Sequence, residues 1–390
     1  MTGICEACDM HRRWLLRGIA LSLGASAFPL RAQAKDKLLD EVVEFTGSVL
    51  FLSSNVPGLV IGAVRNGETS VFGFGTTGRP GTQLPDGQTL LRIGSVTKVF
   101  TGAVLAGLVS DGLVKLTDPL QARLGWDVQI PTKDGKSIRL IDLATHTSGL
   151  PREVERAPAP ADNPFATITK EAFIKNLRDD PLLFAPGTGA LYSNFGFDLL
   201  AQALASSAGK PYEDLLRERV LTPAGLKSVV FAPENGQSKQ LMQGHDFAGT
   251  LLPDVPTAPM IVGSGGLYAT PDDILRWLGW HLDRFSRSGA EMRLLDHAAY
   301  VQRSGLNPVF GMDESGHMDA MSLGWVIMMP TRDHPLILQK AGGLQGIFSY
   351  AAFAPTGGVG AFVAINQFNF GAAQAMAKAI NAMIATLAAP

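Results

Sequence analysis

The segments typical of β-strands lie at the two ends of this 390-residue chain, and the long stretch between them has helical patterns. Near the N-terminus, two segments rich in β-branched and aromatic residues flank Asn66-Gly67, a pair that favours a two-residue hairpin turn. Three more such segments lie near the C-terminus. The predicted strands are residues 58–64, 69–74, 323–329, 347–353 and 359–365. A single sheet therefore requires the first strands of the chain to pair with the last.

Helical patterns enclose and separate these strands. They cover residues 36–51, 138–144, 170–177, 197–208, 212–220, 371–387 and a segment that starts at Thr270 with Pro271 in its first turn. The simplest arrangement is an α+β fold, with one antiparallel sheet flanked by the N- and C-terminal helices and a second lobe made of helices. The sheet lobe takes about residues 35–92 and 320–390, and the helical lobe about residues 93–319. We expect an active-site cleft between them.

A serine opens one of the apolar helical segments of the chain. Ser95 is followed by apolar residues at helical spacing until Gly112. The free N–H groups and the dipole at a helix N-terminus favour negative charge, and Lys98 lies one turn further on the same face. A hydroxyl, an amine and a positive backbone pole together suit acyl transfer. The alternative is an N-cap serine followed by an ordinary surface lysine.

The same Ser-x-x-Lys spacing occurs a second time, at Ser207-Ala-Gly-Lys210. This copy falls where a helix is predicted to end, with Gly209 as the C-cap and Pro211 after it. No N–H groups converge on Ser207 there, so we interpret this copy as structural.

Two further motifs carry groups that could act on a substrate. Tyr192-Ser-Asn194 places a phenol and a carboxamide two residues apart in a turn before a helix. Lys340-Ala-Gly-Gly343 precedes a predicted strand, where a lysine can bind a carboxylate and glycines let a substrate approach the backbone. Taken singly, Tyr-x-Asn is more typical of packing, and the lysine motif is typical of a solvated strand end.

Residues 1–34 have the pattern of an export signal. Arg12 and Arg13 begin a basic segment similar to a twin-arginine signal, an apolar stretch too short to span a bilayer follows, and Ala32-Gln-Ala34 is a small-x-small cleavage site. We expect cleavage near Ala34 and a periplasmic protein. Membrane association is expected only through an uncleaved leader.

Composition excludes several classes of function. The net charge of −2 becomes −4 without residues 1–34, which favours neither nucleic acid nor an anionic membrane as a partner. Both cysteines, Cys5 and Cys8, lie in the leader, so the mature chain has no disulfide. The seven histidines lack zinc-protease spacing, and neither a Gly-x-Ser-x-Gly elbow nor a phosphate-binding loop occurs. We therefore predict no metal and no cofactor.

Taken in order, Ser95-x-x-Lys98, Tyr192-Ser-Asn194 and Lys340-x-Gly342 resemble the three active-site elements of the serine β-lactamase and penicillin-binding protein superfamily, in its class C branch. Five further segments are similar to AmpH-type D-alanyl-D-alanine carboxypeptidase/endopeptidases. These are residues 144–153, 209–212, 263–271, 311–313 and 323–325. The resemblance runs from about residue 58 to the end and implies a β-lactamase/transpeptidase-like fold.

This resemblance implies a role for each motif residue. Ser95 would be the nucleophile that forms an acyl-enzyme, and Lys98 and Tyr192 would move the proton. Asn194 would hold the substrate's amide, Lys340 and Gly342 would bind near the terminal carboxylate, and the N–H groups of Ser95 and Gly343 would form the oxyanion hole. Peptidoglycan stem peptides or β-lactams would be the substrates.

One position departs from the family pattern. Where the family has Lys-Thr-Gly, this chain has Ala341, which lacks a hydroxyl expected to help bind the carboxylate. The leading hypothesis is a periplasmic DD-peptidase. A class C β-lactamase and a carboxylesterase of the same fold remain alternatives, and a non-catalytic penicillin or muropeptide sensor is a fourth reading.

Overall fold

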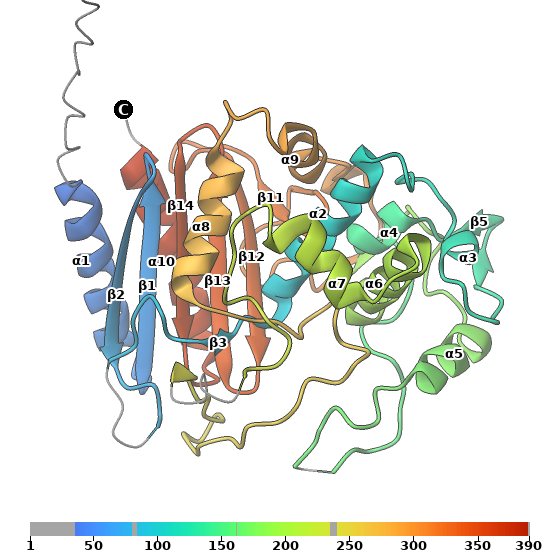
Figure 1. Ribbon diagram of the computed structural model, residues 1–390, viewed down its shortest axis with the longest axis horizontal. Helices are drawn as coiled ribbons and strands as arrows, with labels where there is room; N and C mark the ends of the chain where they lie inside the picture. Colours follow the sequence, from blue (N-terminus) through green and yellow to red (C-terminus); the bar gives the residue numbers. More distant parts are fainter. Residues whose placement is uncertain (1–35, 80–83, 161, 235–239, 389–390) are drawn as a thin grey trace, which may run out of the picture. The chain divides into compact units, whose positions relative to one another are not determined.

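The computed structural model describes residues 36–79, 84–160, 162–234 and 240–388, so the predicted export signal at residues 1–34 lies outside the described residues. The main sheet has eight strands in the order β2-β1-β14-β13-β12-β11-β10-β8, and each pair is antiparallel (Figure 1). Its strands are β1 (Gly58–Arg65), β2 (Glu68–Gly75), β8 (Val301–Gln302), β10 (Ala320–Met321), β11 (Val326–Met328), β12 (Ile337–Leu344), β13 (Ile347–Ala354) and β14 (Val359–Ile365). The predicted pairing of the first and last strands is confirmed, because β1 lies against β14.

The turn between β1 and β2 sets the register of this hairpin. Asn66 has a φ of 52° and Gly67 a φ of 80°, so both residues of the turn adopt the left-handed conformation. A type I′ turn needs this conformation at both positions, and it matches the right-handed twist of the flanking strands. The predicted Asn-Gly hairpin is therefore confirmed.

Helices cover the two faces of the sheet. α1 (Lys37–Ser54) and α10 (Phe370–Ala388) pack on one face, where they share a hydrophobic cluster with Leu59 and Ile61. Alternate residues of the same strand, such as Val60, face α8 (Pro271–Leu282) on the other side (Figure 1). α8 falls within the residues expected in the helical lobe, yet it packs on β1 and β14.

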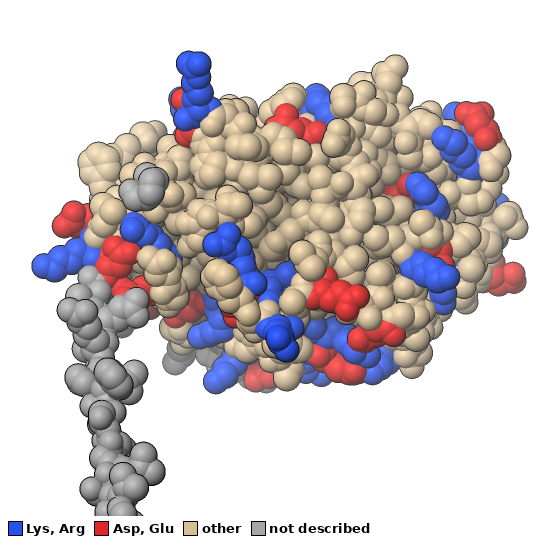
Figure 2. Space-filling model, turned by 90° about the horizontal axis from the view of Figure 1, so that it is seen from above, with Lys and Arg blue, Asp and Glu red and all other residues tan. Residues whose placement is uncertain are grey.

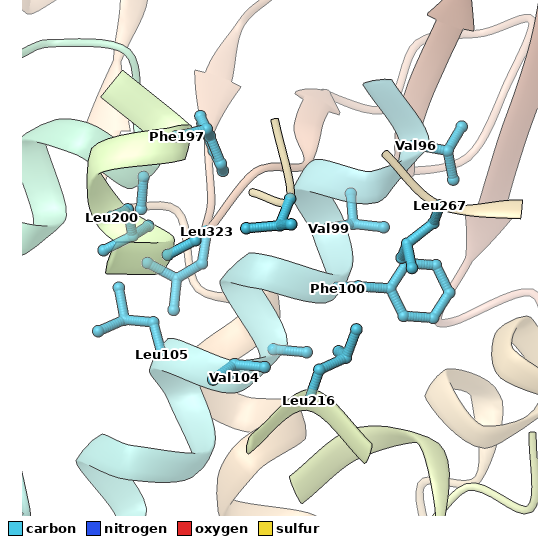
Figure 3. Close-up of a cluster of buried hydrophobic side chains, with 14 of the residues drawn as sticks. Val96, Val99, Phe100, Val104, Leu105, Phe197, Leu200, Leu216, Leu267 and Leu323 are labelled. Carbon is cyan, nitrogen blue, oxygen red and sulfur yellow. The ribbon is translucent and has the colours of Figure 1, made fainter. Parts of the chain in front are cut away.

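The helical lobe is built around α2 (Thr97–Ser110), which is buried along nearly its whole surface. A helix that is apolar all round has no solvent face and must be enclosed by other elements. Figure 3 shows Val99, Phe100, Val104 and Leu105 of α2 among side chains from its neighbours. The other helices are α3 (Leu120–Arg123), α4 (Leu140–Ala144), α5 (Lys170–Asp179), α6 (Asn194–Ala208), α7 (Tyr212–Leu216) and α9 (Ala290–His297).

Short elements complete the lobe. The 3₁₀ turns are η1 (Gly94–Val96) and η4 (Arg303–Gly305), and the π-turn η2 (Arg217–Leu221) continues α7. Two-stranded pairs form between β3 (Leu91–Arg92) and β7 (Tyr268–Ala269), β4 (Thr132–Lys133) and β5 (Lys136–Ser137), and β6 (Ala190–Leu191) and β9 (Val309–Phe310). No helix in the described part of the chain is long and apolar enough to cross a membrane.

One predicted strand is shorter than expected and one strand was missed. Of the strand predicted at residues 323–329, only Val326–Met328 form β11, and Gly324, with a φ of 92°, lies in the turn between β10 and β11. β12 was not predicted as a strand, because its charge and paired glycines have the pattern of a loop. Lys340 consequently lies within a strand of the main sheet and is only 3% exposed, which excludes the solvated strand end.

Candidate active site

Ser95 lies in η1, the single 3₁₀ turn that links β3 to α2, rather than in the first turn of an α-helix. This turn is pressed against β12. A Cβ atom added at Gly342 would lie 2.1 Å from the carbonyl oxygen of Ile93 and 2.9 Å from the nitrogen of Ser95. The Ser349 hydroxyl donates to the same Ile93 carbonyl at 2.9 Å. The contact therefore requires glycine and holds the backbone of Ser95 against the strand.

The N–H groups of Ser95 and Gly343 belong to these two facing segments. A Cβ atom on Gly94, which has a φ of 50°, would lie 2.6 Å from the nitrogen of Gly343. β11 pairs only with Ile337–Gln339 of β12, so among the described residues the remainder of β12 has η1 rather than a strand on that side. This geometry suits the predicted oxyanion hole, in which backbone donors converge on one oxygen.

Lys98 is fully buried and its ammonium nitrogen has three partners. Its Nζ lies 3.2 Å from Ser95 Oγ, 2.6 Å from Asn194 Oδ1 and 2.7 Å from the carbonyl oxygen of Ser264. The spacing of three residues on a helical path places Lys98 directly beside Ser95. The alternative of a surface lysine is excluded.

The surroundings of Lys98 disfavour its charged form. Burial is the main cause that lowers the pKa of Lys98 well below its usual value, and the nearby ammonium of Lys340 lowers it further. The carboxylates of Asp198 and Glu153 oppose this shift. A lysine with a lowered pKa can accept a proton near neutral pH.

Tyr192 follows β6 and is held by His146. The His146 ring stacks on the Tyr192 ring with centroids 4.5 Å apart, and His146 Nδ1 accepts from the N–H of Ser193 at 3.0 Å. Burial raises the pKa of Tyr192 far above its usual range, while its hydrogen bond to the Ser95 side chain lowers it. The phenol is therefore protonated and within reach of the predicted nucleophile.

Lys340 reaches the same tyrosine from β12. Its Nζ lies 4.6 Å from the centroid of the Tyr192 ring, and Lys98 Nζ lies 4.9 Å from it. Burial lowers the pKa of Lys340 to about 7, Glu314 opposes this shift, and Arg152 adds to it. The three motifs predicted from the sequence thus converge on one place.

Asn194 begins α6, with Ser193 as the N-cap: the Ser193 hydroxyl accepts from the N–H of Gly196. The amide oxygen of Asn194 accepts a hydrogen bond from Lys98, and its amide nitrogen donates one to Glu153. A cavity of about 220 Å³ opens beside Asn194 and is bordered by Ser95 and Gly343. The same cavity is lined by Glu153, Val154, Arg156, Phe165, Ile168, Phe173, Phe195, Asp198, Ile261, Ser264, Gly265 and Leu344.

Two residues of this network were not predicted. Asp198 is buried and accepts from the N–H groups of Gly263 and Ser264 and from the Ser264 hydroxyl, at 3.1, 2.8 and 2.9 Å. Its carboxylate thereby orients the loop whose carbonyl binds Lys98. A single acid within the apolar run of α6 was the available signal. Glu153 ends the segment 144–153 that is similar to AmpH-type enzymes, but no local pattern marked it as a functional residue.

One group of three described residues could hold a metal ion: His281, Asp296 and His297. His281 Nδ1 lies 2.8 Å from His297 Nε2, so these two ring nitrogens share a hydrogen bond, while His281 Nε2 and Asp296 Oδ1 have no hydrogen-bond partner among the described residues. These residues belong to α8 and α9, which contribute nothing to the Ser95 cavity.

Charged residues of both signs are interspersed on the face seen in Figure 2, without a large area of one sign.

The comparison with protein families decides the classification, because residues 36–383 match the family described as Beta-lactamase. The chain belongs to the beta-lactamase family. The family predicted from the motifs is confirmed, and so are the fold and the class of enzyme, a serine hydrolase. The match covers both lobes and all three motifs.

Individual relatives agree with this classification. The D-alanyl-D-alanine-carboxypeptidase/endopeptidase AmpH of Escherichia coli K12 is 37% identical over 352 residues, which are 89% of each chain. A beta-lactamase of Pseudomonas fluorescens is 27% identical and covers 84% of this chain and 93% of its own. The crystal structure of a beta-lactamase/D-alanine carboxypeptidase from Yersinia pestis, complexed with citrate, has a TM-score of 0.80 at 34% identity, covering 90% of this chain and 98% of its own.

Proposed function

We propose that this protein is an exported serine DD-peptidase, a D-Ala-D-Ala carboxypeptidase/endopeptidase that acts on peptidoglycan peptides through an acyl-enzyme on Ser95 and is acylated by penicillins. The observation that carries the proposal is the buried amine of Lys98, 3.2 Å from the Ser95 hydroxyl. The 37% identity to AmpH supports the choice of substrate.

In the first step, Ser95 Oγ attacks the carbonyl carbon of the penultimate D-alanine. Lys98, whose lowered pKa favours the neutral amine, accepts the hydroxyl proton. The N–H groups of Ser95 and Gly343 bind the oxyanion, and each such donor contributes about 3–4 kcal/mol. Tyr192, kept protonated by burial, donates to the leaving nitrogen, so that the peptide bond breaks and D-alanine departs.

In the second step, a water molecule attacks the ester formed at Ser95. Tyr192 and Lys98 are the groups placed to take the water proton and to return a proton to Ser95 Oγ. Asn194 holds the acyl part of the substrate in both steps, whereas Lys340 binds the terminal carboxylate only in the first step, before D-alanine departs. No metal or cofactor takes part in this scheme.

Incubation with three substrates tests the proposal. A D-Ala-D-Ala pentapeptide, nitrocefin and p-nitrophenyl butyrate are offered side by side to the full chain and to Ser95→Ala. We expect release of D-alanine from the peptide by the wild type and no turnover by the variant. Turnover of the butyrate ester alone would instead assign an esterase.

Fast turnover of nitrocefin is the outcome that identifies the second candidate, a class C β-lactamase. The similarity to the Pseudomonas fluorescens enzyme favours this alternative, at 27% identity. The two enzymes differ in how fast water reaches the ester at Ser95.

The proposed export signal is tested separately, by sequencing the N-terminus of the protein recovered from the periplasm.

A further inference from the structure

A salt bridge lies beside the catalytic tyrosine. Arg152 Nη1 donates to Glu314 Oε1 at 2.9 Å, and the side chains are 46% and 56% exposed. The guanidinium carbon of Arg152 lies 4.6 Å from the centroid of the Tyr192 ring. Arg152 and Lys340 are therefore two cations that contact one ring, and that ring carries the hydroxyl bonded to Ser95.

Glu314 interacts with both cations. It bonds to Arg152 directly, and its charge raises the pKa of Lys340 while Arg152 lowers it. The free protein thus already holds one of its own carboxylates next to the pair of cations. A half-exposed ion pair of this kind contributes little free energy, so an incoming carboxylate can displace it.

The backbone of Arg152 is fixed relative to the substrate-binding end of α6. Its carbonyl oxygen accepts from the N–H groups of Asn194 and Phe195 at 2.9 and 3.3 Å. A Cβ atom on Gly311 would lie 3.6 Å from Arg152 Nη1 and 3.5 Å from Tyr192 Cβ, so this loop packs closely on the other side. The backbone of Arg152 is therefore fixed beside Tyr192 independently of Glu314.

We infer that Arg152 is a specificity residue for substrates with a free terminal carboxylate: it exchanges Glu314 for that carboxylate and binds it together with Lys340. Its planar fork can supply the donors that the absent hydroxyl at Ala341 would have given. This inference rests on the proposed function and identifies the substrate class as acyl-D-amino acids with an unblocked C-terminus.

Two peptides that differ only in charge test this role. Diacetyl-L-lysyl-D-alanyl-D-alanine and its C-terminal amide are compared on the wild type, Arg152→Ala, Arg152→Lys and Glu314→Gln. With Arg152→Ala we expect KM for the free acid to rise at least about tenfold while kcat/KM for the amide stays within about twofold. Arg152→Lys restores part of the loss, and Glu314→Gln lowers KM for the acid.

Arg217→Ala serves as the matched control, because Arg217 forms a similarly exposed ion pair with Asp214 in another part of the helical lobe. It should leave both KM values unchanged. Equal losses on acid and amide with Arg152→Ala, or an unchanged KM for the acid, would overturn the inference. Circular dichroism melts show that each variant is folded.

A failure of the proposed DD-peptidase function can be distinguished from a failure of the inference about Arg152. If the wild type hydrolyses neither peptide, the same variants are compared in their acylation by benzylpenicillin and by its methyl ester, followed by intact-mass spectrometry. A loss confined to the free acid still supports the role of Arg152. An equal loss on both compounds contradicts it.

Discussion

The chain contains Ser-x-x-Lys twice, and the two copies have different surroundings. At Ser95-Val-Thr-Lys98, the serine lies in a turn held against β12, and the lysine is fully buried beside it. At Ser207-Ala-Gly-Lys210, the serine lies in the last turn of α6, where Gly209 ends the helix with a φ of 63°. Lys210 instead bonds to Glu218 at 2.6 Å.

The second copy has none of the partners that we expect to make the first reactive. Ser207 Oγ is buried and has no hydrogen-bond partner among the described residues. Lys210 Nζ forms an exposed ion pair with the Glu218 carboxylate rather than a hydrogen bond with the Ser207 hydroxyl. We therefore expect the motif to be chemically active only where other segments bury the amine and supply N–H donors.

Removing each serine gives the largest expected difference. Ser95→Ala should lower kcat/KM for every substrate by at least about 10⁴-fold, because the acyl-enzyme cannot form. Ser207→Ala should leave kcat/KM within about twofold of the wild type. Steady-state kinetics on the D-Ala-D-Ala pentapeptide measure both. Equal losses in the two variants would remove the distinction.

Removing each lysine should give the next largest difference. Lys98→Met keeps much of the side-chain volume but removes the base, so we expect acylation by benzylpenicillin to slow by about 10²–10⁴-fold. Lys210→Ala should acylate at the wild-type rate. Stopped-flow acylation measures the two rates, and a Lys98→Met variant that is folded and acylates normally would disprove the role of the amine.

The glycines beside the two motifs are expected to differ for a steric reason. Gly342→Ala places a Cβ atom 2.1 Å from the Ile93 carbonyl and 2.9 Å from Ser95 N. A shift of η1 by about 1 Å should slow acylation by about 10²-fold. Gly209→Ala meets no atom within 4 Å and strains only its own φ of 63°, which should lower the free energy of unfolding by about 1–2 kcal/mol.

Acylation rates and urea unfolding of both glycine variants separate these two effects. A rate loss in Gly209→Ala, or an unchanged rate in Gly342→Ala, would contradict the assigned contacts.

The amines around Ser95 also make that site sensitive to pH. Lys340 carries a charge below its pKa of about 7 and loses it above, so Lys340 attracts a carboxylate substrate only on the acid side. The ratio of kcat/KM for the pentapeptide to kcat/KM for p-nitrophenyl butyrate should therefore fall as pH rises through about 7, by up to about tenfold. The uncharged ester corrects for titration of Lys98.

Lys340→Met should make this ratio independent of pH, and Lys210→Ala should keep the wild-type profile. A flat ratio in the wild type would show that Lys340 does not bind the carboxylate.

The smallest expected effect is on stability at the second copy. Ser207→Ala removes a buried hydroxyl that has no partner and introduces a better helix former, so the free energy of unfolding should rise by about 0.5 kcal/mol. Lys210→Ala breaks an exposed ion pair and should change it by no more than about 0.5 kcal/mol. Urea titrations measure both. A clear loss of stability in Ser207→Ala would reveal a hidden partner.

Much of the fold could be predicted because its signals are local. The bounds of the strand Val359–Ile365 were predicted to the residue, and the residue types Asn66 and Gly67 alone were enough to predict the turn. β12 was missed because Lys340 is stabilised in a strand by Tyr192 and Glu314, which are distant in sequence. Its glycines are required by contacts with η1 that no local pattern reports.

The site residues also divide into those that local motifs predict and those that depend on distant contacts. Ser95, Lys98, Tyr192 and Asn194 lie in recognisable motifs, and the structure brings them together. Asp198 acts by orienting the Ser264 loop, so its importance depends on a contact across 66 residues of chain. The part played by Arg152 likewise depends on a partner 162 residues away.

The central claim is that the hydroxyl of Ser95, and not that of Ser207, becomes covalently bound to substrate. Incubation of the full chain with benzylpenicillin, followed by tryptic digestion and mass spectrometry, tests this directly. We predict one penicilloyl group per chain, on the peptide Ile93-Gly-Ser-Val-Thr-Lys98. An adduct on Ser207 or elsewhere would contradict the account. Hydrolysis of the D-Ala-D-Ala pentapeptide by the Ser95→Ala variant would contradict it as well.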